Sequence, residues 1–546
     1  MRQTWARLFF AGISVIGGMC APGAQGAVVG GAASAAPRPN VLFILADDLG
    51  WGDPSCYGNG KFRTPSIDRL ARQGTLFTQF YQGGSVCSPS RGTLLTGRWP
   101  SELRLHGHLA SARQNEERAM AQFLDPAAVT LPRLLKQAGY STAHVGKWHL
   151  GHPPGTGESL ATYGFDVARF IDGRNGTTNV WAVEERPRAT RLLVDEALSV
   201  LGGLKDKPFY CQLWLNDPHA SLAPSDEQMA PFRGKTPKGF TTPFAVYAAT
   251  VKEMDRQLGR VLDALDEWGI ATNTVVIFSS DNGPEDIEIS NAAWSGIGSA
   301  GPLRGRKRSL YEGGTRVPFI VRWPQGGAPA GQVNTRTVVS GADLLPTVCE
   351  LAGVALPAEV KAQQRGQSVA PAFRGDKSFL RSEPLMWEWR FRVFNHPWNR
   401  SPALAIRDGS WKLLLNPDRS RVELYDAERD SGEQLNLAAA HPDVVARLSD
   451  RVLAWQKTLP PGPVEDSAGK NDYPWPQEGA LSKQELTRGP LFEKSDKDGD
   501  GVLTREEYMK NFSDREKQVG RERFPIFDAN KDGKLSRDEF IHMGRE

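Results

Sequence analysis

The chain has 546 residues, of which 40% are hydrophobic and 24% are charged, and its formal net charge is +3. These values are typical of a soluble globular protein, and the length predicts about two to four domains. Because no long basic run accompanies the small net charge, nothing in the composition favours nucleic acid or an anionic membrane as a partner.

The N-terminal segment has the layout of a secretory signal peptide. Arg2 and Arg7 precede an apolar stretch over residues 8–19, and small residues follow it. That stretch is too short to span a bilayer comfortably, and no other segment is long and apolar enough to be a membrane helix. We therefore expect residues 1–36 to be a signal peptide. The mature protein is expected to be secreted or periplasmic, with no stable membrane span.

Two continuous apolar runs indicate strands that are buried on both faces of a sheet. The runs and the polar pairs that follow them are residues 40–46 with Asp47 and Asp48, and residues 274–280 with Asp281 and Asn282. Between the runs, residues 251–265 carry apolar side chains at helical spacing. This alternation predicts an α/β catalytic domain over residues 37–384, a mixed sheet flanked by helices. In such sheets the chemistry lies at the carboxyl ends of the strands.

The pattern changes after residue 384. Residues 403–415 are typical of a hairpin turning at Asp408-Gly409, and residues 442–459 are typical of a closing helix. We expect a smaller antiparallel subdomain over residues 385–460. A segment rich in Pro, Gly and polar residues, 461–488, then predicts a linker.

Residues 489–546 contain two loops with the ligand spacing of EF-hand calcium loops. The ligand positions are Asp496, Asp498, Asp500, Val502 and Glu507 in the first loop and Asp528, Asn530, Asp532, Lys534 and Glu539 in the second. Val502 and Lys534 would contribute backbone carbonyls. Because Gly489-Pro490 leaves little room for a helix before the first loop, we expect an abbreviated all-α pair that binds structural calcium.

The string Cys-Ser-Pro-Ser-Arg at residues 87–91 resembles the signature of the type I sulfatases of the alkaline-phosphatase-like superfamily, and the chain looks arylsulfatase-like. Taken alone, the string is also compatible with a turn that carries a free cysteine. The resemblance implies that a maturation enzyme oxidises Cys87 to formylglycine, whose hydrated aldehyde is the nucleophile. It also implies that Arg91 orients and stabilises this group.

The resemblance implies a metal site as well. The ligands it implies are Asp47, Asp48, Asp281, Asn282 and the modified residue 87. The four Asp and Asn side chains offer hard oxygens, which favour calcium or magnesium over zinc. We expect calcium, with magnesium as the alternative.

Three further segments match motifs of the family, and they occur along this chain in the same order as in the family. They are Gly146-Lys147-Trp148-His149, Asp217-Pro218-His219 and residues 303–314, whose spacing assigns Lys307. By resemblance, Lys147 holds sulfate oxygens, and His219 with Lys307 protonates the leaving oxygen. His149 removes the proton of the second hydroxyl, and Asp281 helps deprotonate the attacking one.

Two competing functions remain open at this stage. A phosphate ester hydrolase of the same superfamily would usually carry Ser or Thr as nucleophile and bind zinc through several His, whereas this chain has nine His in all. A calcium-dependent binding protein would carry an inactive sulfatase domain.

Export favours a sulfated carbohydrate over a small aryl ester as the substrate. The loops that would contact it are residues 173–176, 220–238 and 388–398. In the region of the last loop, Trp387, Trp389 and Trp398 are equally compatible with sugar stacking and with packing.

Overall fold

The computed structural model describes residues 38–157, 159–173, 178–234, 242–286, 293–394, 396–471, 483–510, 512–513, 517–528 and 530–542. The expected signal peptide lies outside these residues, as do parts of the first two loops expected to contact substrate. Within the described ranges, no helix is both long and apolar enough to cross a membrane.

A nine-stranded mixed sheet forms the centre of the catalytic region. Its strands are β1 (Asn40–Ala46), β2 (Thr75–Tyr81), β3 (Ser141–Gly146), β4 (Val167–Arg169), β5 (Phe209–Trp214), β6 (Thr274–Ser280), β7 (Arg316–Arg322), β8 (Gln332–Asn334) and β9 (Val339–Ser340). The order is β4-β3-β5-β1-β6-β7-β2-β8, with β9 also paired to β2. Strands β4, β3, β5, β1 and β6 run parallel, and β7 is antiparallel to both of its neighbours. The two apolar runs predicted as strands are therefore the central strands β1 and β6.

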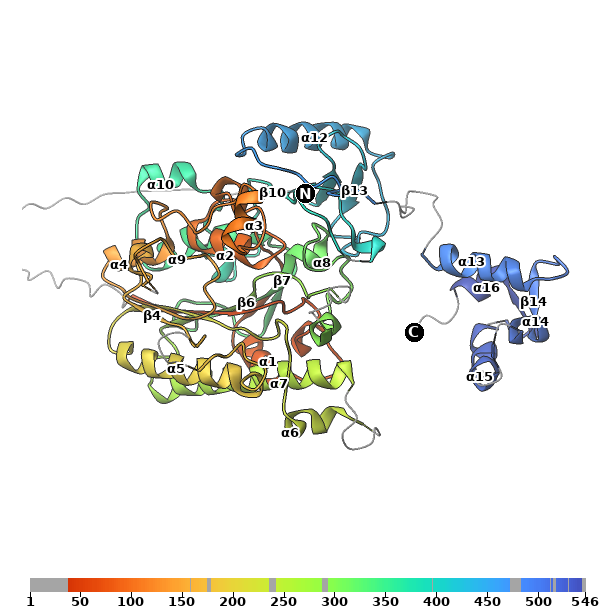
Figure 1. Cartoon of the computed structure of the whole chain (residues 1–546), viewed down its shortest axis with the longest axis horizontal. Coiled ribbons are helices and arrows are strands. Elements are labelled where there is room, and N and C mark those ends of the chain that lie inside the picture. Colours follow the sequence, from red (N-terminus) through yellow and green to blue (C-terminus); the bar gives the residue numbers. More distant parts are fainter. Residues whose placement is uncertain are drawn as a thin grey trace, which may run out of the picture. The chain divides into compact units, whose positions relative to one another are not determined.

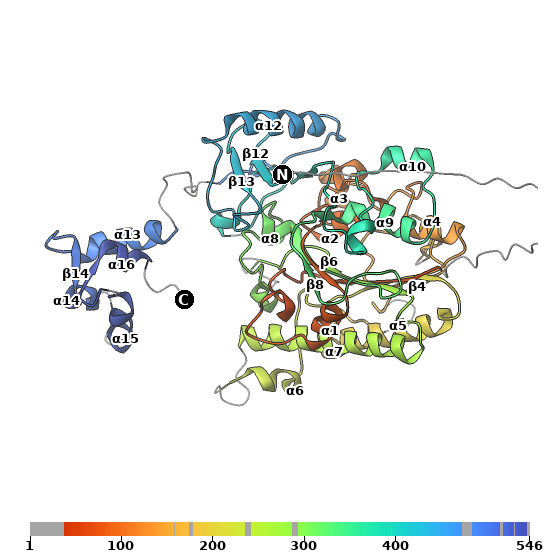
Figure 2. The same ribbon diagram turned by 180° about the vertical axis from the view of Figure 1, so that it is seen from behind.

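Helices cover both faces of this sheet, as Figures 1 and 2 show. One face carries α1 (Pro65–Gln73), α5 (Ala189–Leu204) and α7 (Pro243–Glu267), and the other carries α2 (Cys87–Thr96), α4 (Leu131–Gln137) and α9 (Leu344–Leu351). Shorter helices are α3 (Ala112–Glu117), α6 (Asp226–Met229), α8 (Glu312–Thr315), α10 (Ala358–Gln363) and α11 (Ala370–Phe373). Along β1, Leu42 and Ile44 pack in the hydrophobic core on the face covered by α1, α5 and α7. Val41, Phe43 and Leu45 pack in the core on the opposite face, which α2, α4 and α9 cover. The unbroken apolar run thus reflects burial on both faces.

A smaller antiparallel sheet follows, with the order β10 (Leu385–Glu388), β11 (Leu404–Asp408), β12 (Trp411–Leu415) and β13 (Glu423–Asp426). Helix α12 (Pro442–Gln456) packs on it. The predicted hairpin is present, but its turn is one residue later than expected. Asp408 pairs with Trp411, so the loop is Gly409-Ser410. Gly409 has a φ of 62°, which glycine adopts readily at the first position of such a loop.

A cluster of buried charges joins this small sheet to the main one. Lys412 on β12 lies 2.9 Å from a carboxylate oxygen of Glu312 and 2.9 Å from one of Glu433, and none of the three side chains is exposed. Glu312 also pairs with Arg316 at 3.1 Å and accepts a hydrogen bond from Tyr81 at 2.6 Å. Because Glu312 begins α8, shortly after the segment that carries Lys307, the cluster anchors one end of a loop expected to be catalytic.

The C-terminal unit, taken by itself, contains α13 (Lys483–Ser495), α14 (Arg505–Met509), α15 (Lys517–Phe527) and α16 (Arg537–His542). It also contains a two-stranded sheet of β14 (Val502–Thr504) and β15 (Lys534–Ser536), so the all-α prediction is incomplete. Helix α13 begins inside the expected linker and continues through Pro490, so the expectation of an abbreviated first helix is wrong. Phe492 of α13 packs against Phe540 of α16, with ring centroids 5.8 Å apart. This packing offsets the cost of an internal proline.

Candidate active site

The residues expected to be catalytic meet at the carboxyl edge of the parallel strands. Lys147 and His149 follow β3, His219 follows β5, Asp47 and Asp48 follow β1, and Asp281 and Asn282 follow β6. The register places Ala46 beside Ser280, so the two acidic pairs emerge next to each other. Segments that are distant in sequence therefore form one site, as expected for ligand sites of parallel sheets.

Helix α2 brings Cys87 to this edge at its first position. Cys87 is buried, and its Sγ lies 3.7 Å from Asp47 Oδ1 and 3.5 Å from Lys147 Nζ. Burial raises the pKa of the Cys87 thiol to about 12, although Lys147 and Lys307 act in the opposite direction. The unmodified side chain is thus a neutral thiol near pH 7. The start of a helix carries partial positive charge, which favours an anion at this position.

Arg91 lies one helical turn after Cys87 and is fully buried. Its Nε and Nη2 donate to Asp281 Oδ2 at 3.0 and 2.7 Å, and its Nη1 donates to the carbonyl of Lys147 at 2.7 Å. Asp47 lies 3.7 Å from the same guanidinium. Arg91 therefore ties helix α2 to the ends of β1, β3 and β6.

The two lysines neutralise the first acidic pair. Lys147 Nζ lies 2.6 Å from Asp47, and Lys307 Nζ lies 2.8 Å from Asp48. Burial raises the pKa of the Asp47 carboxyl, but Lys147 and other nearby cations lower it by a larger amount. The pKa of Asp47 therefore falls below its usual value. Asp48 has a left-handed backbone, with φ of 67°, which costs free energy in a non-glycine residue and is common at functional sites.

The donor set fits a divalent cation. Oxygen, sulfur or nitrogen atoms of Asp47, Asp48, Cys87 and His219 lie within 4.8 Å of one another. Asn282 donates to Asp48 Oδ1 at 2.7 Å, while its own Oδ1 is buried and has no hydrogen-bond partner among the described residues. A buried amide oxygen without a partner is costly unless it binds a ligand. The geometry therefore suits a calcium or magnesium ion held by oxygens.

His149 is held in one orientation and one tautomer. Its Nε2 lies 3.0 Å from the carbonyl of Leu109, which requires a proton on Nε2, and its Nδ1 is buried without a hydrogen-bond partner among the described residues. Burial, with Lys147 and Arg91, keeps the pKa of His149 well below 6.5. The ring is thus neutral near pH 7 and presents a basic Nδ1. Ser88 donates to the carbonyl of His149 at 2.7 Å, which fixes this segment to α2.

His219 faces the other side of the site. Its Nε2 lies 3.8 Å from Asp48 Oδ2, and its Nδ1 lies 2.7 Å from the carbonyl of Ala220. Arg186 donates to the carbonyl of His219 and to Asp217, both at 2.7 Å. No sequence pattern pointed to Arg186, because its partners are distant along the chain. Its contacts nevertheless fix the segment that carries His219.

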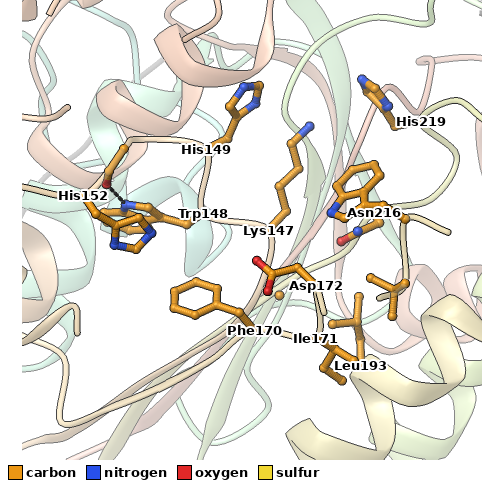
Figure 3. A pocket seen from close by; sticks show the side chains of 14 residues that line it. Lys147, Trp148, His149, His152, Phe170, Ile171, Asp172, Leu193, Asn216 and His219 are labelled. Atoms are coloured by element: carbon orange, nitrogen blue, oxygen red, sulfur yellow. Dashed lines mark hydrogen bonds between the residues drawn. The ribbon is translucent and has the colours of Figure 1, made fainter. Parts of the chain in front are cut away.

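A cavity of about 430 Å³ opens beside these groups. In Figure 3, Lys147 extends toward the space between His149 and His219, and Asp172 and Asn216 also line the cavity. Trp181, which sequence reasoning missed, is a further lining residue. Its ring lies 5.6 Å from Lys147 Nζ and meets His219 edge to face at 5.7 Å. The volume is that of a small-ligand site.

Two further charged residues support Lys307. Glu285 lies 3.2 Å from Lys307 Nζ and pairs with Arg308. Burial raises the pKa of Glu285, but Lys307 and Arg308 lower it more. The backbone N–H of Arg308 donates to the carbonyl of Ser85 at 2.9 Å, two residues before Cys87. Sequence reasoning assigned no role to either residue: Arg308 lies inside the matched segment 303–314, and Glu285 follows Asp281 and Asn282 at a distance of a few residues.

Two of the tryptophans considered for sugar stacking serve packing instead. Trp387 and Trp389 are buried, and Trp387 donates its ring N–H to the carbonyl of Gln82 at 2.8 Å. Trp398 is partly buried, and its ring lies 4.3 Å from the guanidinium of Arg304. None of these three lines the cavity beside Lys147.

The two C-terminal loops have their acidic ligand positions turned inward. Carboxylate oxygens of Asp496, Asp498 and Asp500 lie within 4.8 Å of one another, and Glu507 accepts hydrogen bonds from Thr504. The second loop repeats the arrangement. Asp528 accepts hydrogen bonds from the backbone N–H groups of Asp532 and Gly533. Glu539 accepts them from the backbone N–H groups of Asn530 and Ser536. Strands β14 and β15 join the loops through paired Leu503 and Leu535.

Comparison with known proteins gives consistent matches. Residues 39–354 match the sulfatase family, and residues 305–458 match the C-terminal region of N-sulphoglucosamine sulphohydrolase. Residues 487–513 and 521–543 match EF hands. The steryl-sulfatase of Mus musculus is 32% identical, covering 79% of this chain and 84% of that protein. The N-acetylgalactosamine-6-O-sulfatase of Bacteroides thetaiotaomicron is 30% identical, covering 76% of this chain and 92% of that protein.

The fold has solved counterparts as well. The crystal structure of Ps i-CgsB in complex with k-i-k-neocarrahexaose superposes with a TM-score of 0.64 at 28% identity, covering 79% of this chain and 96% of that one. The mixed sheet, the oxygen-rich site and the buried Cys–Arg pair define a hydrolase of the alkaline-phosphatase-like class. Within that class, the chain belongs to the sulfatase family and is a sulfatase, an enzyme that hydrolyses sulfate esters.

Proposed function

We propose that this sulfatase acts on a sulfated carbohydrate outside the cytoplasm. Relatives named as N-acetylgalactosamine-6-sulfatases support a carbohydrate, as does the similarity to a structure in complex with k-i-k-neocarrahexaose. The sequence features of residues 1–36 support a secreted or periplasmic location. The observation that carries the proposal is the site itself, in which Cys87 and Arg91 lie among two lysines and the carboxylates of Asp47, Asp48 and Asp281.

The proposal includes modification of Cys87 to formylglycine by a maturation enzyme. The hydrated aldehyde supplies one hydroxyl that attacks the sulfur and a second that lets the sulfate leave as the carbonyl forms again. An unmodified thiol offers neither route, because it is neutral in this environment and has no second hydroxyl.

Each remaining side chain has a role in moving protons or holding charge. Asp281 accepts the proton of the attacking hydroxyl, and Arg91, which donates twice to Asp281, keeps that carboxylate in place. Lys147 holds sulfate oxygens beside residue 87, since its Nζ lies 3.5 Å from Sγ. His219, assisted by Lys307, gives a proton to the leaving oxygen as the sulfur–oxygen bond breaks. Such proton transfers typically contribute about 10²- to 10⁴-fold to the rate.

His149 completes the cycle in this proposal. Its Nδ1 is the unprotonated nitrogen and has no partner among the described residues, so it accepts the proton of the second hydroxyl. Sulfate then leaves, and water restores the diol. In this proposal His219 donates a proton to the leaving oxygen and His149 accepts one from the second hydroxyl. The two rings lie on either side of Lys147, which agrees with these separate roles (Figure 3).

Asp47, Asp48, Asp281 and Asn282 would hold the active-site cation, calcium or magnesium, together with residue 87. Such a cation supplies positive charge that stabilises the sulfate oxygens as negative charge develops. The three carboxylates in this set face Arg91, Lys147 and Lys307, so their charges are already balanced. An added divalent cation makes the site positive, as an anionic ester requires. The EF hands are proposed to bind structural calcium.

Mass spectrometry and a substrate panel test the proposal together. The peptide containing Cys87, taken from protein made in its native source, should carry an aldehyde in place of the thiol. The same protein should release sulfate from members of a panel of sulfated mono- and oligosaccharides. Cys87→Ser should keep the fold and cut turnover by about 10³-fold or more, because a serine ester lacks the second hydroxyl. An unmodified Cys87 in a protein that releases no sulfate would instead favour the calcium-dependent binding protein.

A further inference from the structure

A second cavity, of about 520 Å³, lies in the smaller subdomain. Its lining includes Arg392, Arg400, Asn416, Arg421, Lys470 and Asn471. We call it the basic pocket. None of its residues belongs to the site described above. Its walls come from three separate segments, and only Arg392 and Val393 belong to a loop expected to contact substrate, residues 388–398. Its volume is within the range of pockets that bind small organic ligands.

The basic pocket carries an excess of positive charge. Four of its lining residues are cationic, and none of the described residues that line it is a carboxylate. Arg421 pairs with Glu423 at 3.0 Å, and the carboxylate of Glu465 accepts the backbone N–H of Arg392. The side chains of Arg392 and Lys470 form no ion pair with a carboxylate in the part of the chain that the structure describes. Both are exposed, so they can meet an anionic ligand.

The walls of the pocket are firmly held. Arg421 donates to the carbonyl of Gly469 at 2.6 Å and to the carbonyl of Arg400 at 2.9 Å. Asn416 donates to the carbonyl of Gly469 at 3.2 Å. These contacts join the three lining segments to one another. The cavity is therefore a feature of the folded subdomain and does not depend on one loop.

Phe394 connects the basic pocket with the catalytic site. Its ring lies 5.4 Å from the guanidinium of Arg392, which lines the pocket, and 6.0 Å from that of Arg308. Arg308 in turn shares Glu285 with Lys307. Phe394 is 42% exposed, so its ring is accessible to a ligand that lies beside these two arginines. A chain of contacts thus leads from Lys307 through Arg308 and Phe394 to the pocket.

We propose that the basic pocket binds the anionic groups of a sulfated oligosaccharide whose reacting sulfate occupies the catalytic site. The inference rests on the proposed function and specifies it, because it makes the substrate an oligosaccharide with more than one anionic group. Arg392 and Lys470 would bind sulfate or carboxylate groups, and Phe394 would contact an intervening sugar ring. A monosaccharide or an aryl sulfate is too small to use both places.

The test compares two variants that remove the same charge. Arg392→Gln with Lys470→Gln removes two pocket cations, and Arg429→Gln with Lys361→Gln removes two exposed cations elsewhere. Kinetics are measured on p-nitrophenyl sulfate and on whichever chondroitin, carrageenan or heparin hexasaccharide the wild-type enzyme desulfates fastest. We expect the pocket variant to raise KM for the hexasaccharide about 10-fold or more, to flatten its salt dependence, and to leave turnover of the aryl sulfate unchanged.

The possible results separate the pocket from the chemistry. Equal effects of the two variants on the hexasaccharide would overturn the role of the pocket, as would an unchanged KM. An equal loss on both substrates would also overturn it, since a specific subsite does not affect a small ester. If the wild-type enzyme turns over the aryl sulfate but none of the hexasaccharides, the proposed carbohydrate substrate is wrong, and this inference is wrong with it.

Discussion

Replacing Lys412 by Met should destabilise the catalytic region in a manner that depends on pH. The side chain lies 2.9 Å from both Glu312 and Glu433, with no exposure to solvent. Without it, Glu312 keeps Arg316 and Tyr81, whereas Glu433 keeps only the backbone N–H of Glu312 at 2.7 Å. The uncompensated charge is therefore that of Glu433.

Protonation of Glu433 limits the cost. Burial already raises its pKa to about 7, although Lys412 lowers it, so removal of Lys412 raises this pKa further. In the variant, Glu433 is neutral when folded and ionised when unfolded at pH 7, so folding takes up a proton. Because wild-type Glu433 is itself neutral well below pH 7, the loss of stability relative to the wild type is small at pH 6 and reaches about 1.4 kcal/mol at pH 8. The variant thus loses stability as pH rises.

Thermal unfolding at pH 6, 7 and 8 measures this effect. An unfolding entropy of about 2.1 cal/mol/K per residue makes the expected fall in Tm, relative to the wild type, about 2 °C at pH 8 and smaller at pH 7 and 6, for a region of roughly 400 residues. Lys361→Met, at an exposed position, is the control. Adding Glu433→Gln to Lys412→Met should remove most of the pH dependence. A loss of Tm that is the same at all three pH values, or no larger than in the control, would refute the reasoning.

Three further predictions concern the sites. Asn282→Leu should remove a ligand oxygen, lowering bound metal measured by mass spectrometry and reducing turnover by about 10²-fold or more, with an unchanged circular dichroism spectrum. His149→Ala should slow sulfate release by about 10²- to 10⁴-fold, and rapid mixing should then show a burst of alcohol; a slow step without a burst would contradict its role. Glu507→Gln with Glu539→Gln should weaken calcium binding about tenfold or more by calorimetry, while hydrolysis of an aryl sulfate continues at the wild-type rate.

The central fold could be predicted because burial on both faces leaves a direct mark on the sequence. The apolar runs of β1 and β6 end where the chain turns polar, and the structure places both strands at the centre of the sheet. Local patterns were less reliable where tertiary packing competes with them. Gly489-Pro490 was expected to leave little room for a helix before the first loop, yet α13 continues through Pro490, and its Phe492 packs against Phe540.

In the candidate site, too, the residues marked by local motifs could be predicted, whereas those set by distant contacts could not. The residues expected from the motifs lie together, because each motif includes the strand end that positions it. Trp181 and Arg186 were not anticipated, and Phe394 was included only as part of the loop over residues 388–398. Their positions depend on contacts with residues far away in the sequence, such as Arg186 with Asp217, and no short pattern records such contacts.

The burial of Cys87 has a consequence for the order of events in the life of the protein. Cys87 is 2% exposed, and every residue of α2 is buried. An enzyme that oxidises this side chain needs the peptide in an extended, accessible form, which the folded molecule does not offer. The proposed modification must therefore precede folding. A chain that folds first keeps its thiol, so the fraction of active molecules is set by a competition between two rates during synthesis and export.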